Sequence, residues 1–138
     1  RSDSGIIYMR LEAPLMLRFV GDDPKIEFPE GFEATFFDSL QQPSSRISAN
    51  YGISHEISQL MLAKSDVEVE NFKTGELLNT ETLFWNQKSK QIYTKAFVKI
   101  SAPDKIIYGD SLSATDNFST RTIYNIRATV EIDEKDDF

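Results

Sequence analysis

A pattern of apolar residues recurs along this chain at an offset of about 31 residues. The repeated pair consists of two apolar residues on either side of a polar one: Val67 and Val69, Val98 and Ile100, Val130 and Ile132. Chains with repeats of this length stack one supersecondary unit upon another. Because each pair has the two-residue period of an extended chain, the stacked unit is a β-strand and not a helix. The chain is therefore predicted to build a long β-face or groove, a shape that suits an elongated ligand.

Alternating residues and turn signals extend the strand prediction along the chain. Further short strands are expected at residues 25–28, 32–37, 60–62, 91–93 and 122–124, and the longest loop at residues 38–45. No stretch keeps the apolar spacing of a helix between capping residues. The sequence thus predicts an all-β fold, a single antiparallel sandwich or a twisted, open β-jelly roll that forms a groove. One domain is expected over residues 1–138, with a polar lead-in at 1–5 and an acidic tail at 133–138 that frays.

Composition narrows the class of protein. With 138 residues, 40% of them hydrophobic and 27% charged, the chain can form an ordinary folded domain with its own core. No apolar run approaches the roughly 18 residues that a membrane-spanning helix needs. The net charge of −7 lacks the basic footprint of a nucleic-acid-binding protein. Because the chain begins with Arg1 and not with methionine, we expect a signal peptide or an anchor upstream of it.

The sequence offers no set of residues for catalysis. The absence of cysteine excludes thiol chemistry, disulfides and zinc–thiolate sites. The only histidine, His55, is predicted to lie in a hairpin with no strained nucleophile turn near it. Carboxylates such as Glu68 and Glu70 alternate with apolar residues, which is typical of the solvated face of a sheet. The chain is therefore predicted not to be an enzyme and to carry no metal or cofactor.

The apolar faces of the strands allow two kinds of interior. A plain hydrophobic core is what every β-sandwich needs. Small residues at strand centres, such as Ala49 and Ser111, would instead leave room between the sheets for acyl chains. Trp85 also has two interpretations, because an exposed tryptophan can stack on sugars whereas packing in the core is more common. The sequence is compatible with a filled and with a hollow interior.

Several blocks of the chain resemble, in the same order, blocks of the LptC family. These blocks are FPEGF (28–32), FFD (36–38), ANYG (49–52), VEV (67–69), GELLNTETLFW (75–85), YT (93–94), VKI (98–100) and IYGD (107–110). The resemblance covers nearly the whole chain, from Gly5 to Ile132, and it is carried by the order and spacing of the blocks. The repeat also resembles LptA and the N-terminal part of LptD.

The resemblance implies a periplasmic component of the lipopolysaccharide export system of Gram-negative bacteria. Members of that family are tethered to the inner membrane by an N-terminal helix or a lipid, and they carry an open β-jelly roll. It implies three partners: lipopolysaccharide bound by its acyl chains, an inner-membrane ABC transporter of the LptB2FG type, and an LptA-like bridge protein that pairs edge to edge. Weak, smooth apolar contacts suit a lipid that must be handed on.

Candidate site residues follow from the resemblance and from the alternation. Phe28 lies where the family places an aromatic residue in the lipid-lined interior, and is expected to contact lipid. Alternation alone adds further interior positions: Phe36, Thr80, Thr82, Val98 and Ile100. The strand at residues 122–132 is expected to form the edge that faces LptA, with residues 6–19 toward the transporter. The expected partner-edge residues are Gly109, Ile123, Ile126 and Val130, and a bulky residue at Gly109 is expected to hinder assembly.

Two other classes of function are compatible with the residues alone. A carbohydrate-binding β-sandwich could present Trp85, Tyr93 and Tyr124 as a stacking platform. A structural β-repeat adaptor with a solid core could pair with a partner strand and bind no ligand. A lipid carrier should bind the acyl part of lipopolysaccharide, a carbohydrate module should bind the free polysaccharide, and an adaptor should bind neither.

Overall fold

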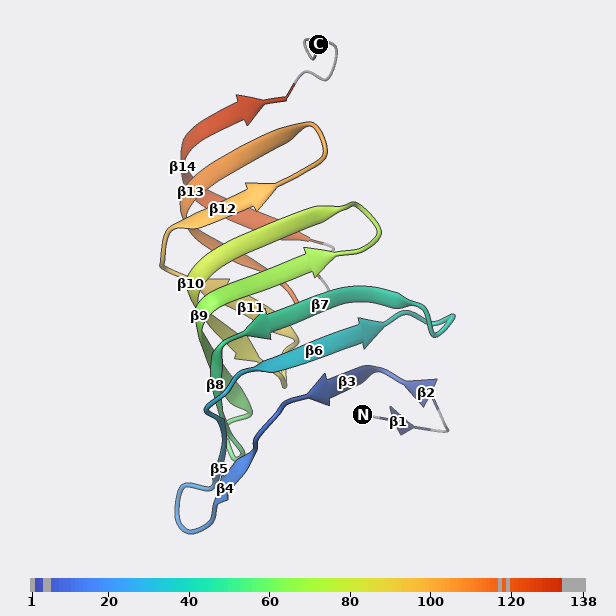
Figure 1. Ribbon diagram of the computed structural model, residues 1–138, viewed down its shortest axis with the longest axis vertical. Helices are drawn as coiled ribbons and strands as arrows, with labels where there is room; N and C mark the ends of the chain where they lie inside the picture. Colours follow the sequence, from blue (N-terminus) through green and yellow to red (C-terminus); the bar gives the residue numbers. More distant parts are fainter. Residues whose placement is uncertain (1, 4–5, 117, 119, 133–138) are drawn as a thin grey trace.

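The fold is built from β-strands. The structure is a computed structural model that describes residues 2–3, 6–116, 118 and 120–132, and every regular element in these ranges is a strand. Most strands join one antiparallel, 12-stranded sheet that runs from β3 (Met9–Glu12) to β14 (Arg121–Glu131) (Figure 1). A separate small sheet pairs β1 (Ser2–Asp3) with β2 (Ile6–Ile7). The all-β, jelly-roll prediction is confirmed.

The remaining strands complete the 12-stranded sheet, in which several neighbours are not consecutive in the sequence. They are β4 (Leu17–Phe19), β5 (Lys25–Phe28), β6 (Phe32–Phe37), β7 (Pro43–Ala49), β8 (Tyr51–His55), β9 (Leu60–Asn71), β10 (Glu76–Asn86), β11 (Gln91–Thr94), β12 (Val98–Ser101) and β13 (Lys105–Thr115).

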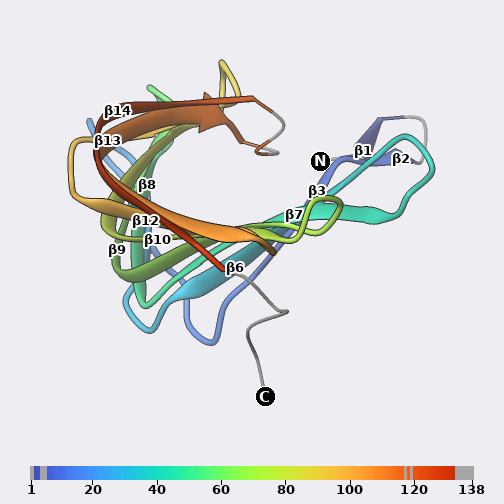
Figure 2. The same ribbon diagram turned by 90° about the horizontal axis from the view of Figure 1, so that it is seen from above.

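The sheet is folded into two walls because its long strands bend in the middle. The first half of β9 pairs with β8 and its second half with β7, and β10 pairs with β12 and then with β11. We call the side that contains β3, β6, β7 and β12 the front wall. The rear wall contains β4, β5, β8 and β11. Figure 2 shows the two walls joined along the bend and separate along the opposite side, which we call the seam.

Irregular backbone marks the bend. In β9, Ser65 and Asp66 both adopt positive φ, at 70° and 53°. The register of β10 against β9 shifts between Thr80 and Thr82, which is the signature of a β-bulge. In β14 the corresponding position is Asn125, whose φ is 55°. A bulge sharpens the local twist of a strand, so one strand can cross from the front wall to the rear wall without a break.

The sequence repeat corresponds to one outward and one return passage between the walls. Val67 in β9 and Val98 in β12 both lie on the front wall and are fully buried. Met61 in β9 and Ile92 in β11 occupy the equivalent buried positions on the rear wall. The offset between repeats is thus the length of chain that runs from one wall to the other and back again, including the two turns between these passages.

The third copy of the repeat departs from the first two. Val130 pairs with Ile106, whereas its neighbour Thr129 pairs with the buried Ile107. Paired residues point to the same side of a sheet, so Thr129 faces the interior and Val130 faces outward. The register shift beside Gly109 changes the phase of β14 relative to β13. A one-residue shift moves every following side chain to the other face.

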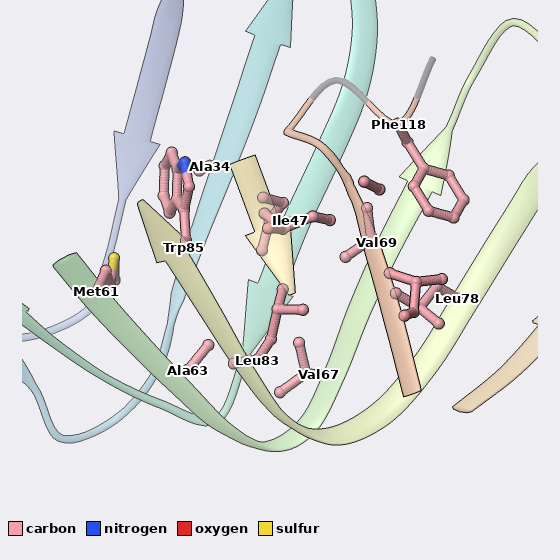
Figure 3. Close-up of a cluster of buried hydrophobic side chains, with 14 of the residues drawn as sticks. Ala34, Ile47, Met61, Ala63, Val67, Val69, Leu78, Leu83, Trp85 and Phe118 are labelled. Atoms are coloured by element: carbon pink, nitrogen blue, oxygen red, sulfur yellow. The ribbon is translucent and has the colours of Figure 1, made fainter. Parts of the chain in front are cut away.

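The core lies between the walls. On the front wall the paired residues of successive strands form one continuous row: Leu11, Ala34, Ile47, Val69, Leu78, Ile100 and Ile107. All members after Leu11 are buried. Figure 3 shows Ile47, Val69 and Leu78 in the same cluster as Trp85 of the rear wall. Side chains of the two walls therefore form one apolar interior.

Two predicted boundaries change. The loop expected at residues 38–45 is shorter, because β7 already begins at Pro43. Asp38 closes the turn by accepting hydrogen bonds at Oδ1 from the backbone N–H groups of Leu40 and Gln42, both at 2.9 Å. Part of the expected lead-in, Ser2–Asp3, is paired in β1. Residues 1, 4 and 5 and the expected tail at 133–138 lie outside the described residues.

Candidate functional site

The centre of the interior is filled with aromatic side chains. The ring centroid of Phe36 on the front wall lies 5.4 Å from that of Trp85 on the rear wall, in an edge-to-face arrangement. Tyr8 packs edge-on against the same Phe36 ring at 5.7 Å. Trp85 is 2% exposed, so the core-packing interpretation of this residue is confirmed, and it cannot serve as an exposed sugar platform.

Two cavities adjoin this packed centre. The first, of about 470 Å³, lies near the β4 end; its lining combines apolar side chains, among them Met16, Ile26, Phe28 and Met61, with polar ones such as His55, Glu56, Gln59 and Gln87. The second, of about 430 Å³, opens at the seam; its lining combines apolar and charged side chains: Tyr8, Phe36, Phe37, Phe118, Lys73 and Arg121. The interior is thus a closed core in the middle with hollows at one end and along the seam.

Most of the predicted interior residues lie between the walls. Phe28 is buried in the wall of the end cavity, where its ring packs against Phe32 at 5.9 Å. Three further predicted residues are fully buried, or nearly so, in the central cluster: Phe36, Val98 and Ile100. Thr80 is also buried, and its Oγ1 donates a 3.0 Å hydrogen bond to the carbonyl oxygen of Phe97. That bond satisfies the hydroxyl and leaves the methyl group for apolar contact.

Thr82 is not an interior residue. It pairs with the exposed Lys64, whereas the next residue, Leu83, is fully buried. Successive residues of a strand point to opposite faces, so Thr82 faces outward. The prediction extended the alternation through residues 80–82 and missed the bulge that lies between Thr80 and Thr82.

A buried polar cluster at the seam was missed from the sequence. The hydroxyl of Tyr8 donates a hydrogen bond to Oδ2 of Asp116 at 3.1 Å, and Trp85 Nε1 donates to the same oxygen at 3.4 Å. Asp116 is 4% exposed. The ammonium of Lys90 lies 4.5 Å from the centroid of the Tyr8 ring. Burial, and then the charge of Asp116, raise the pKa of Tyr8 well above its ordinary value of 10.0.

The raised pKa of Tyr8 makes a prediction at alkaline pH. The folded protein favours the protonated phenol, so this contribution to stability is complete below pH 10.0 and is lost as the pH rises above it. The pKa of Tyr51 is also raised, by its hydrogen bond to Glu27, so the test uses a Tyr51→Phe background. There, ultraviolet absorbance of tyrosinate should show Tyr8 ionising late, and adding Tyr8→Phe should remove that step. Survival of the same late step in Tyr8→Phe would show that another residue causes it.

The described residues hold no arrangement that suggests catalysis or metal binding. No group of three or more histidine, cysteine or acidic side chains gathers there as a metal site. His55 Nδ1 lies 3.5 Å from Asp23 Oδ1 at the exposed end of β8, with no nucleophile in that contact. In the described ranges we also find no helix long and apolar enough to cross a bilayer.

Comparison with known families decides the identity of the chain. A family model described as lipopolysaccharide-assembly, LptC-related, matches residues 2–131. The chain belongs to the LptC family. This confirms the resemblance read from the sequence and gives the protein a role in lipopolysaccharide transport as a periplasmic component of that system. LptC is a transport family and not an enzyme family. No curated protein matches the chain.

The C-terminal edge of this LptC-family sheet is β14. Among the described strands β14 pairs with β13 alone, so its second side is unpaired. Two of the predicted edge residues, Ile126 and Val130, are about half exposed, at 58% and 48%. Ile123 instead pairs with the buried Leu112 and packs against the core. An unpaired strand with exposed apolar side chains is suited to pairing with another strand.

Gly109 does not lie on the unpaired edge. It is a buried residue of β13 that pairs with Val98 on one side and Ile126 on the other. A Cβ atom at this position would come within 2.5 Å of Cγ2 of Ile123. The LptC sequence therefore requires glycine here so that β14 can close onto β13.

Gly109→Val should loosen β14. Relief of the contact with Ile123 requires a shift of that side chain and its strand, and overpacking of this kind costs about 1–3 kcal/mol. Hydrogen exchange should report faster exchange of the β14 amides while β9 and β10 keep their protection. Ser111→Val, two residues along β13 and paired with Tyr124, is the matched control. Equal protection of β14 in both variants would contradict this assignment.

Proposed function

We propose that this LptC-family chain, acting as a single domain, carries lipopolysaccharide by its acyl chains in the apolar interior between the walls. The observation that supports this most is the unbroken apolar row from Leu11 to Ile107, which crosses every strand of the front wall between its two ends. Such a row offers a lipid similar apolar contacts at each strand and no buried polar group that would hold it in one place. A lipid can then move along it in small steps of similar energy.

The β4 end is proposed to receive the lipid from an inner-membrane ABC transporter. Several apolar side chains are exposed around β4: Leu15, Met16, Leu17, Phe19 and Val20. The larger cavity lies beside them and reaches the apolar side chains of Phe28 and Met61 in the interior, with polar side chains around the rest of its lining. Exposed apolar surface next to such a hollow supports a docking and receiving end. An anchor upstream of Arg1 is proposed to hold this end at the inner membrane.

The β14 end is proposed to deliver the lipid to an LptA-like partner. Addition of a partner strand to β14 would continue the sheet beyond its last strand. Exposed Ile126 and Val130 would be covered by such a strand. The two ends of the sheet thus differ in structure, with a cavity beside β4 and a long unpaired strand at β14, which supports different partners at the two ends.

Lipid binding can be followed through Trp85, the only tryptophan of the chain. Its ring is buried against Phe36, so acyl chains that separate the walls should change its fluorescence. We expect a saturable change with lipopolysaccharide and with lipid A, and none with free O-polysaccharide. A response to the polysaccharide alone would support a carbohydrate module. No response to any ligand, with strand pairing to a partner retained, would support an adaptor.

A further inference from the structure

Among the described residues, three side-chain hydrogen bonds join the walls across the seam. Asn71 at the end of β9 donates a hydrogen bond from Nδ2 to the carbonyl oxygen of Phe118 at 3.1 Å. Glu76 at the start of β10 accepts a hydrogen bond from Arg121 NH1 at 2.6 Å. The third contact is the hydrogen bond from Tyr8 to Asp116. We call these six residues the clasp: Tyr8, Asn71, Glu76, Asp116, Phe118 and Arg121.

Backbone hydrogen bonds do not replace the clasp within the described residues. Those between neighbouring turns stay within one wall, as for Gln87 N–H to Gln59 O at 2.9 Å on the rear wall. On the front wall the equivalent bond joins Phe72 N–H to Ser44 O at 3.0 Å. The walls are continuous only at the bend. Side-chain contacts at the seam therefore control how far the walls can separate, because separation breaks no ladder of the sheet.

Phe118 connects the clasp with the interior. Its side chain is 2% exposed and belongs to the central cluster, which it joins from the chain segment after β13 (Figure 3). Its backbone adopts a positive φ of 61°, a conformation that a phenylalanine rarely takes. The guanidinium of Arg121 lies 5.7 Å from the centroid of its ring. The ring thus occupies space between the walls that an acyl chain would otherwise use.

A filled centre imposes a condition on lipid binding. Phe36, Ile47 and Leu78 are at most 1% exposed, so acyl chains cannot lie beside them while the walls keep this spacing. Interiors packed to this degree change by discrete rearrangement and not by continuous stretching. The bend keeps its backbone pairing, and the seam is the side on which the walls can move apart.

We infer that the clasp is a lateral gate, and that acyl chains enter the interior through the seam when its three contacts open. This inference rests on the proposed lipid-carrying function and adds to it the route of the lipid and the residues that regulate it. Opening breaks the Asn71–Phe118 and Glu76–Arg121 contacts and moves the Phe118 ring out of the central cluster together with Arg121. Closure without lipid protects the apolar row from water.

A reversible cross-link across the seam tests the gate. Because the chain has no cysteine, Glu76→Cys with Arg121→Cys places one thiol on each wall, and a cleavable bismaleimide joins them. The matched control is Asp110→Cys with Arg127→Cys. It replaces an ion pair of 2.8 Å between neighbouring strands β13 and β14 and does not cross the seam. The rate of the Trp85 fluorescence change with lipid A is measured before cross-linking, after it, and after cleavage.

We expect the cross-link across the seam to slow lipid binding at least tenfold, cleavage to restore the rate, and the control cross-link to leave it unchanged. Equal rates in the cross-linked and cleaved seam protein would overturn the gate while the proposed function stands. Absence of lipid binding in every protein, with the folded spectrum retained, would overturn the proposed function and the gate with it.

A second variant opens the clasp instead of locking it. Asn71→Ala removes the hydrogen bond to Phe118, and with it the Oδ1 atom that accepts from the backbone N–H groups of Lys73 and Thr74. We expect lipid A to bind several-fold faster, and Phe118→Ala to bind faster still. Asn86→Ala, which removes an equivalent turn acceptor between β10 and β11 and lies outside the clasp, is the control. Unchanged rates in a folded Asn71→Ala protein, together with unchanged rates in the cross-linked protein, would exclude a gate at this seam.

Discussion

Val98→Asp should lose more than about 4 kcal/mol of unfolding free energy, or fail to fold. Val98 is fully buried at the start of β12, and its cross-strand neighbour Gly109 offers no side chain to pair with a charge. The carboxylate would have to be ionised without a partner, be protonated, or push the walls apart. Urea denaturation followed by Trp85 fluorescence measures the loss.

The adjacent position provides the control for this prediction. Lys99 follows Val98 in β12 and points to the other face of the sheet. Lys99→Asp should change the unfolding free energy by less than about 1 kcal/mol, as is usual for a surface substitution. If both variants were equally stable, Val98 could not be part of a dry interior. If Val98→Asp folded and still bound lipid, the acyl chains would have to run elsewhere.

Phe36→Ala should cost about 3–5 kcal/mol, the range for deletion of a buried phenylalanine ring. Phe36 is 1% exposed and contacts the rings of both Tyr8 and Trp85, so its loss leaves a void where the walls meet. Because the void lies beside the seam cavity, we also expect lipid A to bind more readily at temperatures where the variant remains folded. Thermal or urea unfolding gives the first effect and a lipid titration the second.

Phe97 is the matched control for Phe36. It is 55% exposed and stacks on Tyr108 of β13, with ring centroids 5.8 Å apart, outside the central cluster. Phe97→Ala should cost no more than about 1.5 kcal/mol, the value of an exposed aromatic pair. A cost for Phe36→Ala as small as that for Phe97→Ala would mean that the walls do not pack on this ring.

The regular parts of the fold were predictable from the sequence because the alternation of apolar and polar residues indicates a strand. The strands predicted at residues 25–28 and 32–37 coincide with β5 and β6, since Pro29 and Gly31 end one and begin the next. The buried pair Val98 and Ile100 followed from the same alternation. A two-residue period is a local property, and any stretch of a few residues displays it.

The errors occur where the backbone leaves that period. Thr82 was predicted to be an interior residue. The prediction was wrong because a bulge adds a residue to the strand, and no characteristic side chain in the sequence marks its position. Val130 was aligned with Val98, although the shift beside Gly109 turns it outward. The alternation also gave no sign that the centre is packed, because filled and hollow interiors need the same apolar face.

The contacts of the clasp could not be predicted from local patterns in the sequence. Tyr8 and Asp116 are separated by 108 positions in the sequence and meet only because the sheet folds into two walls. Asn71 and Glu76 flank the turn between β9 and β10 and resemble ordinary turn and surface residues. A contact between walls depends on the angle of the bend, which is set by a few irregular residues such as Ser65 and Asp66.

Photocrosslinking to purified lipopolysaccharide tests the central claim most directly. A benzophenone amino acid replaces Phe28, which is buried at the end cavity, or Phe97, which is exposed on the outer face. We expect adducts from position 28 and none from position 97. Excess lipid A should prevent formation of these adducts, and O-polysaccharide should not. Adducts of equal yield from both positions, or from Phe97 alone, would contradict a lipid-carrying interior.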